Sequence, residues 1–180
     1  SDAPMVRHGN WLSISGTAAR RTGRASDDIL MSQDTYPEQE ILLKVMSRES
    51  LSGLLGHATA MEKSSGLEPW GEENFLVELP DKWRLSRWLC SKHSDVPMGY
   101  AVISRKSPSN VHLHRFVISE TGRGFGAFSI HRILGEMKDE AAFFTVFTSR
   151  NAHRAQKFYE SNGFFKLMNV YDDILYIYKT

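Results

Sequence analysis

The sequence holds one cysteine, Cys90, among its 180 residues, and it has no long hydrophobic run. A single cysteine excludes an intrachain disulfide bond and any zinc site made of several cysteines, so the chain is compatible with a reducing compartment. No apolar stretch approaches the roughly 20 residues that a membrane-spanning helix needs. These absences predict a protein that is soluble, makes no membrane contact and is located in the cytoplasm.

Neither sign of charge is in marked excess. The 22 Lys and Arg residues nearly balance the 21 Asp and Glu residues, which leaves a formal net charge of +1. Domains that bind nucleic acid usually carry a marked basic patch, so we expect no nucleic acid partner and favour a small molecule or a peptide. A chain of 180 residues with 41% hydrophobic residues is long enough for one domain with a substantial core, and a second full domain is not expected.

Residues 1–40 differ in composition from the rest, because acidic residues are missing from Ala3 to Ser26 while four arginines occur there. Segments that are rich in arginine, contain serine and lack acidic residues are typical of mitochondrial targeting sequences. The interpretation that we favour is a poorly ordered or edge-packed N-terminal arm, whose residues before Met5 are compatible with a cloning remnant. Residues 41–180 are then expected to form the folded domain.

Apolar periodicity divides the folded domain into strands and helices. Helical spacing predicts one helix from Ala127 to about Asp139 and another from Asn151 to Gly163, and one or two short helices are expected between the first two strands. The strand expected at 141–148 is apolar on both faces, as in a buried central strand. The expected strands are residues 41–46, 83–90, 98–105, 110–119, 141–148, 164–170 and 174–178.

Glycines are concentrated between the run Phe116-Val117-Ile118 and the helix that follows, in the loop Gly122-Arg123-Gly124-Phe125-Gly126-Ala127. At a helix N-terminus, such a loop exposes consecutive backbone N–H groups that favour a phosphate or pyrophosphate. A nucleoside triphosphate loop is excluded, because no glycine in the chain is followed by lysine. A dinucleotide fingerprint, Gly122-x-Gly124-x-x-Ala127, fits poorly, because the next strand ends without an acidic residue and little chain follows it.

A second pattern follows one helix and one strand later. Asn151 can cap a helix by accepting a hydrogen bond from a first-turn N–H, and Gly163 suits the left-handed residue that ends one. Between them, Ala152, Ala155 and Tyr159 share one helix face. On spacing alone, this pattern describes Tyr159 as a core residue.

Together, the two patterns resemble the Gcn5-related N-acetyltransferase (GNAT) superfamily from about residue 41 or 83 to the C-terminus. The residues that carry the resemblance are Thr121–Gly126 for the family's pyrophosphate loop and Asn151, Ala155, Tyr159 and Gly163-Phe164 for its second motif. The resemblance implies an α/β (α+β) fold with a mixed, largely antiparallel sheet, a central parallel strand pair and flanking helices.

The resemblance also implies a chemistry. Acetyl-CoA is then the acyl donor, and an amine attacks its thioester directly, without an acyl-enzyme. Backbone N–H groups at the strand end would stabilise the carbonyl oxygen as it becomes anionic. Tyr159 matches the family's general acid, which protonates the leaving thiolate. The implied cofactor-binding residues are Phe116, Val117, Ile118, Thr121, Gly122, Arg123, Gly124, Phe125, Gly126, Ala127 and Asn151.

The attacking amine needs a base, because an alkyl ammonium with a pKa of about 10.4 is mostly protonated at neutral pH. His112 and His114 lie on one face of the strand that leads into the glycine loop, and histidine titrates near neutrality. We take both as candidate bases, with Glu78 as a fallback; the competing interpretation is that the histidines face a polar cleft or a sheet edge. The pair could also chelate a metal, but no third ligand stands in an obvious motif, so we expect no metal.

Two functions stay open at this point. The first is an N-acetyltransferase that transfers an acetyl group from acetyl-CoA to a primary amine of a small molecule, peptide or protein. The second is a non-catalytic acyl-CoA-binding or regulatory module of GNAT fold. Thr121 leaves room for the second, because the family usually places Gln or Arg there. A homodimer is compatible with the resemblance, and the motifs do not specify the acceptor.

Overall fold

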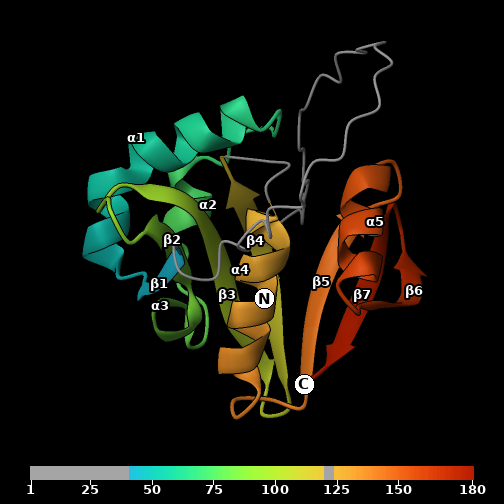
Figure 1. The fold of residues 1–180 in the computed structure, drawn as a ribbon. Helices are drawn as coiled ribbons and strands as arrows, with labels where there is room; N and C mark the ends of the chain where they lie inside the picture. The colour runs from blue at the N-terminus through green and yellow to red at the C-terminus, as the bar shows by residue number, and fades with distance from the viewer. Residues whose placement is uncertain (1–40, 120–123) are drawn as a thin grey trace, which may run out of the picture.

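The computed structural model describes residues 41–119 and 124–180, so the predictions for residues 1–40 and for Thr121, Gly122 and Arg123 lie outside the described residues. One seven-stranded sheet runs through this part of the chain in the order β1-β2-β3-β4-β5-β7-β6 (Figure 1). Neighbouring strands are antiparallel except for the parallel pair β4 and β5. This arrangement confirms the expected mixed, largely antiparallel sheet.

The bounds of the elements are as follows. The strands are β1 (Ile41–Val45), β2 (Arg87–Ser91), β3 (Pro97–Ser107), β4 (Asn110–Ile118), β5 (Phe143–Ser149), β6 (Phe165–Val170) and β7 (Asp173–Lys179). The helices are α1 (Arg48–Ser64), α2 (Glu72–Leu76), α3 (Lys82–Leu85), α4 (Phe125–Met137) and α5 (His153–Ser161).

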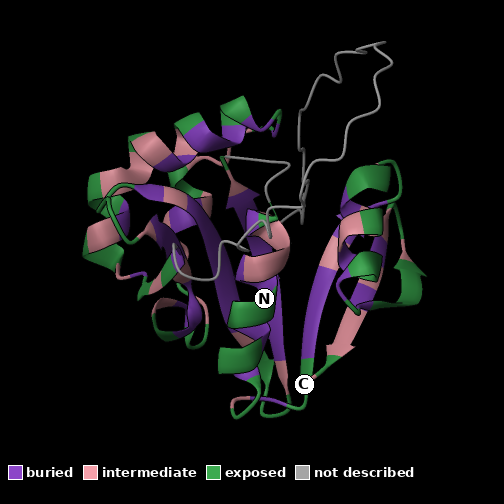
Figure 2. Ribbon diagram, in the orientation of Figure 1, coloured by how far each residue is buried: buried purple, intermediate pink, exposed green. Residues whose placement is uncertain are grey.

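Helices cover both faces of the sheet, and each face has its own hydrophobic cluster. Helices α1 and α2 pack on one face through Leu51 and Phe75, while α4 and α5 pack on the other through Ile133 and Ala155. Cys90 belongs to the α1/α2 cluster, and burial raises the pKa of its thiol. Figure 2 shows that the central strands are buried and that the outer strand β6 is exposed.

The strand expected at residues 83–90 is wrong in its first half. Residues 83–85 belong to the short helix α3, and β2 begins two residues later. This single turn buries Lys82 and Leu85, which are three residues apart and therefore share a side of the helix. The Lys82 ammonium donates hydrogen bonds to the backbone oxygens of Phe75 and Val77, so its charge is solvated by the end of α2.

The other helices agree more closely with expectation. Between β1 and β2, where one or two short helices were expected, the chain forms three helices, α1, α2 and α3, and α1 is 17 residues long. The N-cap Ser47 of α1 accepts a hydrogen bond from the Ser50 N–H. Helix α4 begins at Phe125, two residues before the expected start. Helix α5 ends just before Gly163, whose φ of +86° confirms the predicted left-handed residue.

The parallel pair β4 and β5 opens into a split. The two strands pair over four register positions, from Asn110↔Phe143 to Leu113↔Val146. Both strands continue beyond this point, and each stays paired on its outer side, β4 with β3 and β5 with β7. In the described part of the chain, no register pair joins β4 to β5 beyond Leu113↔Val146. Figure 1 shows the diverging strands, with α4 in front of β4 and α5 in front of β5.

A buried ion pair joins α1 to the part of β4 that lies beyond the last pair with β5. Arg115 Nε lies 2.8 Å from Glu62 Oε1, and both side chains are almost completely buried. The Tyr100 hydroxyl donates to the same oxygen at 2.7 Å, and the Trp70 backbone N–H donates to Glu62 Oε2 at 2.9 Å. A buried carboxylate is tolerated when both oxygens have partners of this kind. The Glu62–Arg115 pair therefore fixes α1 over β4.

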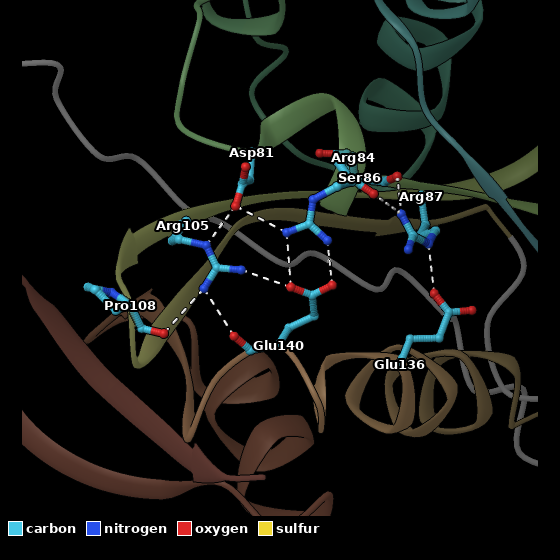
Figure 3. A network of polar contacts seen from close by, with 8 residues as sticks. All are labelled: Asp81, Arg84, Ser86, Arg87, Arg105, Pro108, Glu136 and Glu140. Carbon is cyan, nitrogen blue, oxygen red and sulfur yellow. Dashed lines mark hydrogen bonds and ion pairs between the residues drawn. The ribbon is translucent and has the colours of Figure 1, made fainter.

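A second ionic network lies where the loop after α4 meets α3 and β3 (Figure 3). Glu140 accepts hydrogen bonds from Arg84 and Arg105, and Asp81 accepts from the same two arginines. The Arg105 guanidinium holds the pKa of Asp81 below its ordinary value, and Arg84 does the same for the pKa of Glu140. Both carboxylates are thus more stable as anions in the folded chain than in the unfolded one.

The substitution Arg105→Met tests this network through its pH dependence. Carboxylates with a lowered folded-state pKa stabilise the fold above their unfolded pKa, and this contribution is lost as the pH falls through the folded pKa. We expect Arg105→Met to lower Tm at about pH 7 by on the order of 2–4 °C. The difference from wild type should shrink as the pH falls from about 4.5 to about 3. Thermal unfolding followed by circular dichroism measures both, with the exposed neighbour Lys106→Met as control; a difference that is equal at both pH values would contradict the role.

Two glycines of α4 have different surroundings, and they form a matched pair. A Cβ on Gly126 would lie 3.2 Å from Cε2 of Phe158, a ring that stacks on Phe116, whereas a Cβ on Gly135 would meet nothing within 4 Å. Alanine is favoured over glycine inside a helix by roughly 0.5–1 kcal/mol. We expect Gly135→Ala to raise the free energy of unfolding by about that amount, and Gly126→Ala to lower it because Phe158 has to move. Urea denaturation compares the two; equal stabilisation would show that Phe158 moves at no cost.

Candidate functional site

The end of β4 provides an edge on which a ligand could lie. Phe116, Val117 and Ile118 end this strand, and they pair with β3. In the described part of the chain, no register pair joins them to β5. The side chains of Phe116 and Val117 pack into the two opposite clusters of the core. Their backbone groups on the inner edge are therefore held in place, and they can bind a ligand that lies in the split.

The N-terminus of α4 has no side-chain cap. Gly124 is the N-cap, with a φ of +79° that glycine adopts readily, and it provides no side chain to cap the helix. The first-turn N–H groups of α4, among them those of Gly126 and Ala127, have no acceptor four residues earlier within the helix, as in anion-binding helix termini. The loop residues Thr121, Gly122 and Arg123 lie outside the described residues, so their phosphate-binding role stays a prediction.

Helix α5 brings Tyr159 into the core, on the face of the sheet that α4 and α5 cover. The Tyr159 ring lies among Phe164 and Tyr176, with ring centroids 5.2 Å and 6.4 Å away. Burial raises the pKa of Tyr159 well above its ordinary value, so the hydroxyl keeps its proton at physiological pH. Tyr159 is thus a core residue by its ring and a protonated donor by its hydroxyl.

The expected capping role of Asn151 is wrong. Ala152 is the N-cap of α5, without a side-chain hydrogen bond, and Asn151 is exposed. Other bonds hold this turn: Ser149 Oγ accepts from the Asn151 backbone N–H at 3.2 Å, and Gln156 Nε2 donates to the backbone oxygens of Ser149 and Arg150 at 2.9 Å and 2.8 Å. The Gln156 amide thus holds the carbonyl groups of the turn before α5 and does not cap the first-turn N–H groups of the helix. The cofactor-binding role of Asn151 stays a prediction.

His112 and His114 lie inside the sheet, on the face opposite to Tyr159. Their side chains are 2% and 7% exposed, and their ring centroids are 4.8 Å apart. Val111 and Leu113, which alternate with His112 along β4, point into the cluster that contains Tyr159. A register shift between Val102 and Ile103 of β3 lets β4 carry one extra residue near His114. The histidines share one face, as their spacing indicates, and they lie in the middle of the sheet rather than at its edge.

Side-chain hydrogen bonds hold each of the two histidines, and we call these bonds together the polar chain. Ser104 Oγ lies 2.7 Å from His114 Nε2, and Thr145 Oγ1 lies 2.9 Å from His112 Nδ1. Thr145 Oγ1 also lies 3.1 Å from Asn110 Oδ1. Thr145 was missed because the run 141–148 was interpreted as apolar on both faces; the two threonines in that run, Thr145 and Thr148, were the available signal.

Glu78 and the possible metal ligands were the other candidate site groups. Glu78, the fallback base, is an exposed residue that pairs with Arg48 and accepts a hydrogen bond from the Trp83 indole at 2.7 Å. Within residues 41–119 and 124–180, no three His, Cys, Asp or Glu side chains converge in an arrangement that could hold a metal ion. In the same ranges, no helix is both long enough and apolar enough to cross a membrane.

The chain was compared with models of known protein families and with known proteins. A family profile described as "Acetyltransferase (GNAT) family" matches residues 57–164, which is more than half of the chain. A comparison with curated protein sequences found no significant match.

Solved structures share the fold at low sequence identity. An acetyltransferase from Thermus thermophilus superposes with a TM-score of 0.64 at 17% identity, over 78% of this chain and 97% of that one. The ribosomal-protein-S18-alanine N-acetyltransferase from Escherichia coli gives 0.63 at 14% identity, over 77% and 93%. The PaiA N-acetyltransferase from Thermoplasma acidophilum, in complex with coenzyme A, gives 0.59 at 15% identity, over 78% and 99%. The profile, together with the split sheet, shows that this chain is a member of the GNAT acetyltransferase family.

Proposed function

We propose that this chain transfers an acetyl group from acetyl-CoA to a primary amine of a small molecule, peptide or protein. The observation that carries the proposal is the split between β4 and β5, with Tyr159 on one face of the sheet and His112 and His114 on the other. Two substrates can meet at such an opening from opposite sides. The amine then approaches from the histidine side, and the sulfur leaves on the Tyr159 side.

The residues around the split fit acetyl-CoA. The inner edge of β4 after Leu113 offers backbone groups to the amides of the pantetheine arm, and the first turn of α4 offers N–H groups to the pyrophosphate. Gly124 and Gly126 keep side chains away from that turn. When bound, acetyl-CoA supplies an acetyl group that is activated as a thioester. The related fold of the PaiA enzyme in complex with coenzyme A supports the same donor.

The chain's own residues have separate tasks in direct transfer. A histidine of the polar chain takes the proton that the amine nitrogen loses as its lone pair bonds to the carbonyl carbon. Backbone N–H groups of Phe116 to Ile118 donate to the carbonyl oxygen as it gains negative charge. Tyr159, which is protonated at neutral pH and whose pKa burial raises further, donates its hydrogen to the sulfur as the C–S bond breaks.

Binding and turnover separate this enzyme from a non-catalytic acyl-CoA-binding module of the same fold. We expect isothermal titration calorimetry to give a Kd for acetyl-CoA below about 1 mM, in the range of ordinary substrate affinities. We further expect release of the coenzyme A thiol with at least one member of an amine library. The absence of binding at millimolar acetyl-CoA would rule out the proposal, whereas binding without thiol release for any amine would favour the module.

The substitution Tyr159→Phe isolates the hydroxyl. It keeps the ring that packs against Phe164 and Tyr176, so folding should be preserved. We expect kcat to fall by about 10²-fold or more, the usual contribution of a general acid, with little change in KM for acetyl-CoA. Tyr178→Phe is the matched control, because that ring also packs against Phe164. Unchanged turnover in Tyr159→Phe would remove Tyr159 from the mechanism.

The homodimer and the cytoplasmic location stay predictions. Strand β6 is one of the two outer strands of the sheet in the described part of the chain, β1 being the other. The large apolar side chains exposed on or beside it are Phe165, Leu167, Met168 and Tyr171. An exposed strand edge with apolar side chains is a surface on which a second chain can pair, which supports the homodimer.

A further inference from the structure

Thr145 lies at the apex of the split. It is opposite His112 in the register of β4 and β5, and only one further pair, Leu113↔Val146, follows before the strands part. Its Oγ1 lies 2.9 Å from His112 Nδ1, and the threonine is 5% exposed. A buried side-chain bond therefore joins the two strands near the point where their backbone pairing stops.

The partners of the Thr145 hydroxyl decide which way this bond runs. Besides His112, Oγ1 lies 3.1 Å from Asn110 Oδ1 and 3.3 Å from the Val111 backbone oxygen. A carbonyl oxygen can only accept, so the single hydrogen of Thr145 goes to one of these two atoms. The threonine oxygen then accepts the hydrogen of His112 Nδ1. This direction holds with Asn110 presenting Oδ1, and not Nδ2, to the threonine, and the Val111 backbone oxygen is a second acceptor within reach of the same hydroxyl.

The direction of the bond selects one form of the imidazole. A neutral histidine carries its hydrogen on one ring nitrogen, and the other nitrogen is the base. With the hydrogen of His112 on Nδ1, the lone pair that can take a proton is on Nε2. In His114, by contrast, Nε2 is the nitrogen that is bonded to Ser104 Oγ, at 2.7 Å.

We propose that Thr145 is a positioning residue that holds neutral His112 in its Nδ1–H tautomer, so that His112 Nε2 takes the proton from the attacking amine. The proposal rests on the proposed transferase function and deepens it, because it assigns the base to His112 and its orientation to Thr145. Thr145 acts on the reaction only through His112, as the buried aspartate of a catalytic triad acts through its histidine.

Nitrogen NMR of the full chain labelled with ¹⁵N-histidine tests the tautomer without any substrate. At a pH where the ring is neutral, we expect the His112 hydrogen on Nδ1 in the wild type and in Thr145→Ser. In Thr145→Val, which keeps the shape of the side chain but lacks the oxygen, this preference should be lost. The variant His112→Gln identifies the signals. A wild-type ring with its hydrogen on Nε2, or a Thr145→Val ring that keeps it on Nδ1, overturns the proposal.

Kinetics with an amine found by thiol release test the consequence. We expect Thr145→Val to lower kcat by about tenfold or more, with KM for acetyl-CoA within about twofold of wild type, and Thr145→Ser to restore most of kcat. Full kcat in Thr145→Val overturns the positioning role and leaves the transferase function standing. If the wild type acetylates no amine, the proposed function fails instead, and the NMR result alone decides whether Thr145 sets the tautomer.

Discussion

The parting of β4 from β5 is the constraint on which the rest of this structure depends. Backbone groups inside a sheet are normally paired, so a sheet that opens in its middle needs supports that hold the strands apart. On one face, the Phe158 ring of α5 stacks on Phe116 of β4 and lies close to Gly126 of α4. On the other face, the His112–Thr145 bond spans the strands at the apex. Side-chain contacts on both faces of the sheet thus join elements at the place where β4 and β5 part.

The Glu62–Arg115 pair fixes the position of α1 on the sheet more than it stabilises the fold. A buried ion pair gains little over apolar residues of similar volume, because the cost of removing both charges from water offsets their attraction. Its geometry is nevertheless narrow: Arg115 also donates to the Glu68 backbone oxygen at 2.6 Å, and its guanidinium lies 5.1 Å from the centre of the Trp70 ring. Apolar packing alone would let α1 slide over the sheet, whereas these directional bonds define where it stops.

Local features of the chain could be predicted from the sequence, and features that depend on register could not. Helical spacing placed Tyr159 on the buried face of α5 and Gly163 at its end, because both depend only on periodicity and backbone conformation. An alternating pattern at residues 83–85 fits a single helical turn as well as a strand, so α3 was missed. The polar chain could not be predicted either, because Ser104, His112 and Thr145 belong to three different strands. They become neighbours only through the pairing of those strands.

The burial of Cys90 determines how its thiol reacts. The chain's sole thiol is 1% exposed on β2, and burial keeps it in the protonated form, which reacts slowly with electrophiles and disulfides. A chromogenic thiol reagent added to a reaction mixture will therefore count free coenzyme A rather than the enzyme, as long as the protein stays folded. The onset of labelling at Cys90 would in turn report the opening of the core beneath α1.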